Sequence, residues 1–347
     1  MINGEPFYKL IQGDCLEVLP TLNPQSVDCI VADLPYNVKI ASWDNIKNYD
    51  EWLLQCFKAF ERVLKPNGSL WFFHMNFSVV SRLNCLLEKE TAFRFKQFIT
   101  INKGLQSIAG RCSDNLRSYP RATEYLLFYT FADLTGSQQL SDHYARINPM
   151  AAYLKTEFAR GKVTNREIAK LFPSRTGGMT GCVSNWLKGL NFPLPEQYQQ
   201  MQEYLTNSRP NCALLKREYE DLRREYEDQR YTFNMESGVT DVWDFSFYED
   251  GDGSHPTMKP VKLIKRIIAT STKKGDVVLD PTAGSGSTIK ACKDLERSCI
   301  AIEKSERHYS RTKKQVISQL SLPHFKEQIF TNNPQILLFN SEKSKHE

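Results

Sequence analysis

The 347-residue chain lacks several features that would place it in a functional class at once. It has no run of about 18 consecutive apolar residues, so a membrane-spanning helix is not expected. Its start, MINGEPFYKL, has no basic stretch followed by an apolar run, so no secretory signal is expected. The nine cysteines form no CxxC pair and no even framework, which favours reduced thiols in a cytosol.

A strong excess of charge is also missing, since 45 Lys and Arg stand against 40 Asp and Glu for a net charge of +5. The charge is unevenly placed. Residues 144–191 contain eight basic and two acidic residues, a net charge of +6, whereas the other 299 residues sum to −1. Such a compact basic block is typical of a phosphate-binding module, although a solvated basic face has the same composition. The length itself suggests about two domains of roughly 150 residues.

Helix signals inside this basic block predict short helices joined by a glycine turn. Asn148-Pro149 predicts a helix start, and Thr164 with Glu167 predicts a capping box at the next helix. Beyond the glycine turn, Met179, Val183, Trp186, Leu187 and Leu190 recur at helical spacing. The pattern is typical of helix-turn-helix units, and plain helical hairpins share it. The residues expected to face DNA are Arg166, Lys170, Arg175, Thr180, Ser184, Asn185 and Lys188.

The flanks of the block have another texture, in which short apolar runs alternate with helical patterns. Strands are predicted at 8–11, 27–32, 69–74, 95–101, 124–130, 277–280 and 298–302, and helices at 50–64, 77–89, 260–271 and 286–295. This alternation predicts a doubly wound, parallel-rich α/β sheet. We therefore expect an α/β domain in two parts, 1–132 and 236–320, an all-helical insert at 133–235 and a tail at 321–347.

A glycine-rich turn follows the predicted strand 277–280. It reads Asp280-Pro281-Thr282-Ala283-Gly284-Ser285-Gly286, and it is not a P-loop because the lysine of that motif is missing. Glu303 stands at the end of the next strand, where a carboxylate can accept hydrogen bonds from ribose hydroxyls. Alone, the pattern fits a nucleoside-containing cofactor and a structural turn about equally well.

A second motif, Asp33-Leu34-Pro35-Tyr36, follows the predicted strand 27–32. Pro35 favours an extended Leu34, so the Asp33 carboxylate and the Leu34 carbonyl can converge on one donor, and Tyr36 adds a flat face. This arrangement suits a planar group with an exocyclic amine, such as a base turned out of its helix. The alternative is a simple turn at a strand end.

Together with His255-Pro256-Thr257-Met258-Lys259-Pro260, these two motifs resemble three motifs of the amino-group DNA methyltransferases, which use S-adenosylmethionine. Their order resembles the circularly permuted β group of that family. The resemblance covers about 1–131 and 236–310 and implies a Rossmann-like, seven-stranded methyltransferase sheet. The insert matches the family's target-recognition region in position only.

The resemblance also implies roles for single residues. Asp33 and the Leu34 carbonyl, held by Pro35, would accept hydrogen bonds from the target amine, and Tyr36 would stack on the base. The residues implied to bind the cofactor are Asp14, His255, Thr257, Lys259, Asp280, Thr282, Ala283, Gly284, Ser285, Gly286 and Glu303. Two positions depart from the family pattern, since Leu34 stands in place of the usual proline and Thr282 in place of the usual phenylalanine.

The sequence thus predicts a sequence-specific DNA adenine-N6 methyltransferase that works in the cytoplasm of a bacterium or on a phage genome, at the nucleoid, and without a metal. Cytosine N4 is the alternative target, and a catalytically inactive DNA-binding regulator is the alternative from another class. Double-stranded DNA is the expected partner, and a cognate restriction endonuclease and a homodimer are further partners that the resemblance allows. Further phosphate contacts are expected from Lys39, Arg111, Arg117 and Arg121.

Overall fold

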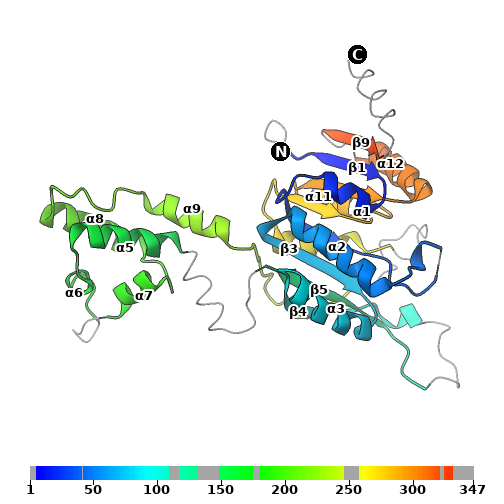
Figure 1. The fold of residues 1–347 in the computed structure, drawn as a ribbon, viewed down its shortest axis with the longest axis horizontal. Helices are drawn as coiled ribbons and strands as arrows, with labels where there is room; N and C mark the ends of the chain where they lie inside the picture. The colour runs from blue at the N-terminus through cyan, green and yellow to red at the C-terminus, as the bar shows by residue number, and fades with distance from the viewer. Residues whose placement is uncertain are drawn as a thin grey trace, which may run out of the picture. The chain divides into compact units, whose positions relative to one another are not determined.

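The computed structural model describes residues 5–40, 42–108, 117–131, 148–174, 180–245, 258–320 and 324–330. Its chain forms two compact units. The first combines Met1–Phe131 with Thr232–Glu347, and the second is Ala132–Tyr231 (Figure 1). Each unit is described separately below.

The first unit is built on one sheet, which has nine strands within the described residues. The strand order is β6-β4-β5-β3-β2-β7-β8-β1-β9. In chain order the strands are β1 (Tyr8–Gln12), β2 (Val27–Ala32), β3 (Leu64–His74), β4 (Arg94–Asn102), β5 (Thr123–Thr130), β6 (Val242–Asp244), β7 (Val277–Asp280), β8 (Ser298–Glu303) and β9 (Phe325–Ile329).

Most neighbouring strands of this sheet run in parallel. β2 pairs in parallel with β3 and β7, β7 with β8, and β8 with β1, whereas β5 runs antiparallel to both β3 and β4. In the centre, Cys29 lies opposite Val278, and Asp280 lies opposite Ala301. Parallel pairing in this register brings the carboxyl ends of β2, β7 and β8 to one edge of the sheet.

Helices cover both faces of the sheet, as the two neighbouring residues Trp71 and Phe72 of β3 show. Phe72 packs edge-on against Phe57, with ring centroids 5.3 Å apart, whereas the Trp71 indole N–H donates to Ser271 Oγ at 2.7 Å. Successive side chains of a strand point to opposite faces. The helix that carries Phe57 and the helix that carries Ser271 therefore lie on opposite faces.

The helices of this unit are α1 (Cys15–Val18), α2 (Tyr49–Val63), α3 (Phe77–Glu90), α10 (Val261–Ser271), α11 (Ser287–Asp294) and α12 (Glu306–Leu320). Short 3-10 turns occur at Leu19–Thr21, Ser42–Asp44 and Leu105–Ile108. α2 has an apolar face that buries Leu53, Phe57 and Phe60 completely, which is why it seals one side of the sheet.

The second unit is helical, with α5 (Pro149–Gly161), α6 (Asn165–Ala169), α7 (Cys182–Lys188), α8 (Pro195–Ser208) and α9 (Tyr219–Gln229). The predicted caps are present. The Asn148 side chain accepts from the Ala151 N–H, and Thr164 forms the reciprocal capping box with Glu167. α6 and α7 share a small core in which the rings of Phe172 and Trp186 meet edge-on, 5.2 Å apart.

Three expectations about the fold need correction. Two short edge strands, β6 and β9, make the sheet wider than the seven strands expected, and β9 lies within the stretch expected to be a tail. Leu190 does not belong to the apolar stripe of α7, because that helix ends at Lys188 and Gly189 turns left-handed, leaving Leu190 48% exposed. Met179 lies outside the described residues. None of the helices in the described ranges is long and apolar enough to cross a bilayer.

We expect Phe57→Ala to lower the free energy of unfolding by about 3–5 kcal/mol, because the Phe57 ring is buried among Phe60, Phe72, Phe93 and Tyr129. Phe77→Ala is the matched control. The Phe77 ring is 61% exposed, so its loss should cost less than about 1 kcal/mol. Urea unfolding followed by circular dichroism measures both values, and equal losses would contradict the burial described.

Candidate active site

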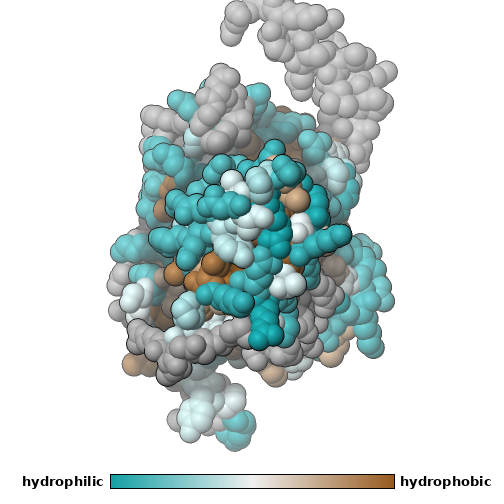
Figure 2. Space-filling view, turned by 90° about the vertical axis from the view of Figure 1, so that its left-hand side faces the viewer, coloured by the Kyte–Doolittle hydropathy of each residue, from teal (hydrophilic) through white to brown (hydrophobic). Residues whose placement is uncertain are grey.

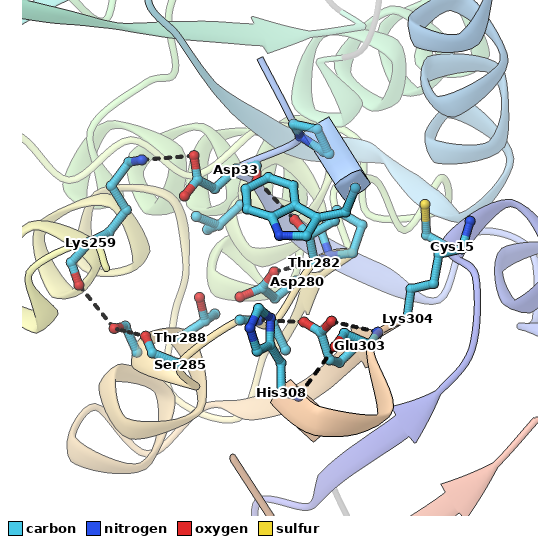
Figure 3. A pocket seen from close by; sticks show the side chains of 18 of the residues that line it. Cys15, Asp33, Lys259, Asp280, Thr282, Ser285, Thr288, Glu303, Lys304 and His308 are labelled. Carbon is cyan, nitrogen blue, oxygen red and sulfur yellow. Dashed lines mark hydrogen bonds and ion pairs between the residues drawn. The ribbon is translucent and has the colours of Figure 1, made fainter. Parts of the chain in front are cut away.

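A cavity of about 510 Å³ opens at the edge of the sheet where β2, β7 and β8 end. Its walls carry the carboxylates of Asp33, Asp280 and Glu303, which follow or end these three strands. Figure 3 shows Asp33 and Lys259 facing each other on one side of this cavity, with Glu303, Lys304 and His308 on another side. A cavity of this size holds a ligand as large as a drug or a cofactor.

The glycine turn after β7 forms the floor of the cavity. Gly284 and Gly286 have φ angles of +50° and +79°, which side chains rarely adopt, and a Cβ on Gly286 would lie 2.8 Å from Thr312 Cγ2. α11 begins directly after Gly286. The turn is joined to the Asp33 motif by Thr282, whose hydroxyl donates to the Asp33 carbonyl oxygen at 3.0 Å. A threonine therefore fits where the family resemblance leads one to expect an aromatic ring.

Asp280 is a buried carboxyl group at the end of β7. Burial raises its pKa to about 7, and the charges of Asp33 and Glu303 act in the same direction. The hydrogen bond from the Thr282 N–H, at 3.0 Å, opposes this rise only in part. A carboxyl group with such a pKa prefers a positively charged neighbour in the cavity, since a cation restores its ionised form.

Glu303 and Asp14 lie on strand ends beside the glycine turn. The Glu303 carboxylate accepts from the N–H groups of Gly284 and Ser305, both at 2.8 Å, and its oxygens keep lone pairs for a further donor. Asp14 caps α1 and forms an ion pair with Lys304 at 2.8 Å. Lys304 and His308 also line the cavity, and neither belongs to a sequence motif that indicates a site.

Asp33, Tyr36, Glu124 and Lys259 form a tight polar cluster, called the Asp33 cluster below. The Lys259 ammonium donates to Asp33 Oδ1 at 2.8 Å and to the Tyr36 hydroxyl at 3.2 Å, and it lies 3.4 Å from Glu124 Oε1. The Tyr36 hydroxyl donates toward Glu124 Oε1 at 2.6 Å and Asp33 Oδ1 at 2.9 Å. Tyr36 therefore does more than offer a flat face, because its hydroxyl connects the two carboxylates.

Glu124 was not expected at the site. It belongs to the strand run Thr123–Thr130, where an acidic residue gives no functional signal, yet its side chain is buried with the residue 4% exposed. Burial opposes its ionisation, but the Lys259 ammonium and Lys103 outweigh this effect and lower its pKa. For Asp33 the balance is reversed. Burial raises the pKa of Asp33, the nearby Glu124 charge adds to that rise, and Lys259 compensates only in part.

A neutral histidine, His74, supports the backbone of the Asp33-Leu34-Pro35-Tyr36 turn. Burial lowers the pKa of His74 to about 4, and its Nδ1 accepts from the Asn76 N–H at 2.9 Å. Nε2 then carries the hydrogen and lies 3.1 Å from the Tyr49 hydroxyl, which in turn donates to the Pro35 carbonyl. This chain of bonds from β3 through α2 fixes the backbone of the Asp33-Leu34-Pro35-Tyr36 turn.

The polar stretch after Tyr36 is held by a single buried carboxylate. Asp44 accepts hydrogen bonds from the N–H groups of Asn37, Val38 and Ile40, at 2.7, 2.9 and 3.3 Å. The loop therefore has an internal structure of its own, and its Trp43 lines the cavity. Lys39 on this loop is exposed, as expected for a phosphate contact.

The structure brings together most of the expected cofactor residues. Asp14, Asp280, Thr282, Ala283, Gly284, Ser285 and Glu303 all line the cavity. Lys259 lines it too, and its ammonium pairs with Asp33 and Glu124. His255, Thr257, Arg111 and Arg175 lie outside the described residues. Among the described His, Cys, Asp and Glu side chains, no group of three could hold a metal ion.

The expected DNA-facing residues of the helical unit divide into two sets. Arg166, Lys170 and Lys188 are exposed, and Ser184 and Asn185 are half-buried. Thr180 is half-buried too, and its hydroxyl donates to the Phe172 carbonyl at 2.9 Å, so its contact with DNA stays a prediction. In the first unit Arg117 and Arg121 are exposed, and Arg121 also donates to the Met75 carbonyl. On the side of the molecule seen in Figure 2, the described surface is mainly hydrophilic.

Comparison with known proteins gives a consistent family match. The model of the DNA methylase family named for N6 and N4 methyltransferases matches residues 27–314. The type II methyltransferase M.HpaI of Haemophilus parainfluenzae is 22% identical over 98% of this chain and 89% of its own length. The type II methyltransferase M2.LlaDCHI of Lactococcus lactis subsp. cremoris is 24% identical over 91% of this chain and 93% of its own length.

Solved structures agree on the fold. The complex of M1.HpyAVI with S-adenosylmethionine superposes with a TM-score of 0.50 at 19% identity, covering 89% of this chain and all of that one. The PvuII DNA methyltransferase, which is cytosine-N4-specific, superposes with a TM-score of 0.53 at 13% identity, covering 93% and 92%. At these identities the likeness establishes the Rossmann-like methyltransferase fold.

The neutral state of His74 predicts a pH dependence of stability. Because burial lowers the pKa of His74 to about 4, the unfolded chain takes up the imidazole proton first as the pH falls below about 6.5. Stability is therefore lost between about pH 6.5 and 4. From pH 7 to pH 5 the wild type should lose about 2 kcal/mol more than His74→Gln, as measured by urea unfolding at both pH values. An equal loss in the two proteins would contradict a neutral His74.

Proposed function

The chain belongs to the N6/N4 DNA methylase family, and from this premise we propose that it is a sequence-specific adenine-N6 methyltransferase of double-stranded DNA that uses S-adenosylmethionine. The observation that carries the proposal is the position of Asp33. Its carboxylate follows β2 and enters the same cavity that the glycine turn and Glu303 line. Asp33, which would accept hydrogen bonds from the target amine, thus lies next to the glycine turn and Glu303, which would hold the nucleoside part of the cofactor.

The cavity fits S-adenosylmethionine by its donor set. Glu303 keeps acceptor capacity for ribose hydroxyls, and Trp43 and Trp52 provide flat apolar walls for an adenine ring. Buried Asp280 suits a cationic group, and the open backbone at Gly284 lets a ligand approach closely. When bound, the cofactor supplies a methyl group on a sulfonium that is already activated for transfer.

The residues of this chain contribute orientation and polarisation. Asp33 and the Leu34 carbonyl accept the hydrogens of the target amine, which directs the nitrogen lone pair toward the cavity. The bond chain from His74 through Tyr49 holds the Pro35 carbonyl, so the turn does not need to reorganise when a base arrives. Fixed dipoles and charges of this kind account for a large share of enzymatic rate enhancement.

A second hollow beside the turn is the place we propose for the flipped base. It has a volume of about 610 Å³ and is lined by Tyr36, Asn37, Tyr49, Asn76 and Arg82, among others. Pro35 lines the cofactor cavity and the neighbouring Tyr36 lines this hollow, so the two spaces meet at the turn. Asparagine side chains and a tyrosine ring suit the hydrogen-bonding edge and the face of a base.

The helical unit is the proposed target-recognition domain. Both acidic residues of the basic block are neutralised within the unit, since Glu157 pairs with Arg160 at 2.7 Å and Glu167 with Arg209 at 2.6 Å. The exposed cations Arg166, Lys170 and Lys188 are then left to contact phosphates. The order of the motifs along the chain supports the permuted β group, and relatives named type II methyltransferases support a role beside a restriction endonuclease.

The first test identifies the methylated base. Duplex DNA treated with the purified enzyme and S-adenosylmethionine is digested to nucleosides and analysed by mass spectrometry, with Asp33→Asn as the matched variant. N6-methyladenine is the expected product, and Asp33→Asn should reduce its rate at least about a thousandfold while cofactor binding stays. N4-methylcytosine would show the alternative target, which the PvuII enzyme of similar fold modifies. Binding of DNA and cofactor without transfer would indicate a regulator.

The second test addresses the helical unit. Replacing Arg166, Lys170 and Lys188 by alanine should weaken DNA binding and reduce the slope of log K against log salt by up to about three, since each lost phosphate contact removes about 0.9. The control replaces Lys58, Lys265 and Lys274, which form surface ion pairs in the first unit. It removes the same charge and should keep the slope. Fluorescence anisotropy from 50 to 300 mM salt measures both, and equal slopes would return the helical unit to a structural role.

A further inference from the structure

Glu124 and Lys259 are buried next to Asp33, and Lys259 also lines the cavity. Lys259 is 7% exposed and contacts Asp33, Tyr36 and Glu124, whereas Glu124 is 4% exposed and contacts Tyr36 and Lys259. They come from different elements, since Glu124 belongs to β5 and Lys259 precedes α10. The turn from Asp33 to Tyr36 includes neither of them.

The buried Glu124–Lys259 pair contributes little to the stability of the fold. Glu124 Oε2 is buried, and no described residue donates a hydrogen bond to it. A buried ion pair with an unsatisfied oxygen costs several kcal/mol of desolvation, and well-packed apolar residues would stabilise the same place better. Two carboxylates also share one ammonium within the cluster, which leaves it with one excess negative charge. A site under selection for stability alone would not keep this arrangement.

The two oxygens of the Asp33 carboxylate have different surroundings. Oδ1 accepts from both Lys259 and Tyr36, at 2.8 and 2.9 Å. Oδ2 accepts no hydrogen bond from the described residues, and the Asp33 side chain is 30% exposed on the cavity side. One oxygen is therefore anchored by the cluster, while the other is available to a ligand.

We propose that Glu124 and Lys259 are positioning residues that anchor Asp33 through Oδ1 and leave Oδ2 to take the proton that the target amine loses. The inference rests on the proposed function, because it concerns the amine on which that function acts. It assigns a role in the reaction to Lys259, which contacts Asp33, and to Glu124, which acts on Asp33 through Lys259 and Tyr36.

The proton leaves the amine after the methyl group has been transferred. Once the nitrogen has gained a methyl group, it carries one hydrogen more than the neutral product and a positive charge. That N–H bond breaks, its electron pair stays on nitrogen, and the proton moves to Asp33 Oδ2. The resulting carboxylic acid then releases the proton to solvent, which restores the carboxylate for the next turnover.

The charges around Asp33 favour this acceptance. Burial and the Glu124 charge raise the pKa of Asp33, and Lys259 limits the rise, so the carboxylate is a better base than an exposed one. The other groups that face the cluster are the Tyr36 hydroxyl, Asp280 from β7, and Lys103 and His74 beside Glu124. Of these, Asp280 has a pKa raised to about 7 and lines the cofactor cavity. The kinetics are therefore measured at saturating cofactor, so that a change in cofactor binding with pH does not alter the profile.

Two variants move the Asp33 carboxyl in opposite directions. Glu124→Gln keeps an acceptor for Tyr36 and Lys259 but removes the negative charge, so Asp33 becomes a weaker base. The acid limb of the kcat–pH profile should move to lower pH, while kcat on the plateau falls about tenfold to a hundredfold and KM for DNA stays. Lys259→Met removes the cation, so the acid limb should move to higher pH. Lys259→Arg should restore the limb of the wild type.

Carboxyl titration gives a readout that needs no turnover. In protein labelled with ¹³C at the aspartate carboxyl carbons, Asp33→Asn identifies the Asp33 signal, and its titration is followed in the free enzyme. The midpoint should fall in Glu124→Gln and rise in Lys259→Met. Glu61→Gln is the matched control, because Glu61 only caps the Ala92 N–H, at 2.9 Å, far from the cluster. Thermal unfolding of each variant establishes that it is folded, and Lys259→Gln, which removes the same charge, replaces Lys259→Met if the latter is not.

The outcomes separate the inference from the proposed function. Opposite movements of the acid limb and of the ¹³C midpoint in the two variants support the inference. A loss of kcat with the limb and the midpoint unchanged would show a merely structural pair and overturn it. If wild-type enzyme transfers no methyl group to DNA, the proposed function fails, while an unmoved ¹³C midpoint would still overturn the inference by itself.

Discussion

The parallel pairing of β2 with β7, and of β7 with β8, is the constraint on which the site depends. Each strand ends in, or is followed by, a carboxylate, and the shared register brings Asp33, Asp280 and Glu303 to one edge of the sheet. The pairing joins segments from opposite ends of the chain. A hydrogen bond from Thr282 to the Asp33 carbonyl then ties the glycine turn after β7 to the Asp33 turn.

Burial raises the pKa values of Asp280 and Asp33, and repulsion between carboxylates that lie close together raises them further. Asp280 and Glu124 differ in their neighbours, so their pKa values shift in opposite directions. Burial raises the pKa of Asp280 to about 7, whereas Lys259 and Lys103 lower the pKa of Glu124 against its burial. Each oxygen of Glu303 accepts a hydrogen bond from one backbone N–H group. The environment thus decides the protonation state of a carboxyl group at this site.

The basic block and the cavity belong to different units. Residues 144–191 carry a net charge of +6 and lie in the helical unit, where both of their glutamates are paired, whereas the cavity lies in the sheet unit. Such a division lets the surface of one unit vary without disturbing the other. Identities of 22% and 24% to two type II methyltransferases over nearly whole chains are in keeping with that freedom.

Local features of the sequence were sufficient for the parts that depend on near neighbours. The seven central strands, the caps at Asn148 and Thr164, and the glycine turn after β7 all follow from residues a few positions apart. Short polar strands such as β9 carry no such signal, since their pairing with β1 depends on a distant edge.

The catalytic environment, by contrast, was decided by tertiary structure. Glu124 is an ordinary strand residue until the antiparallel pairing of β5 with β3 turns it toward Asp33, and Lys259 reaches that carboxylate only because α10 packs on the opposite side of the sheet from α2. The Thr180 hydroxyl likewise meets its acceptor, the Phe172 carbonyl, only in the folded helical unit. The sequence by itself determined which chemical groups exist and which local turns hold them. Only the long-range packing decided which of them share a buried charge, because that sharing depends on strand register and burial that no short segment contains.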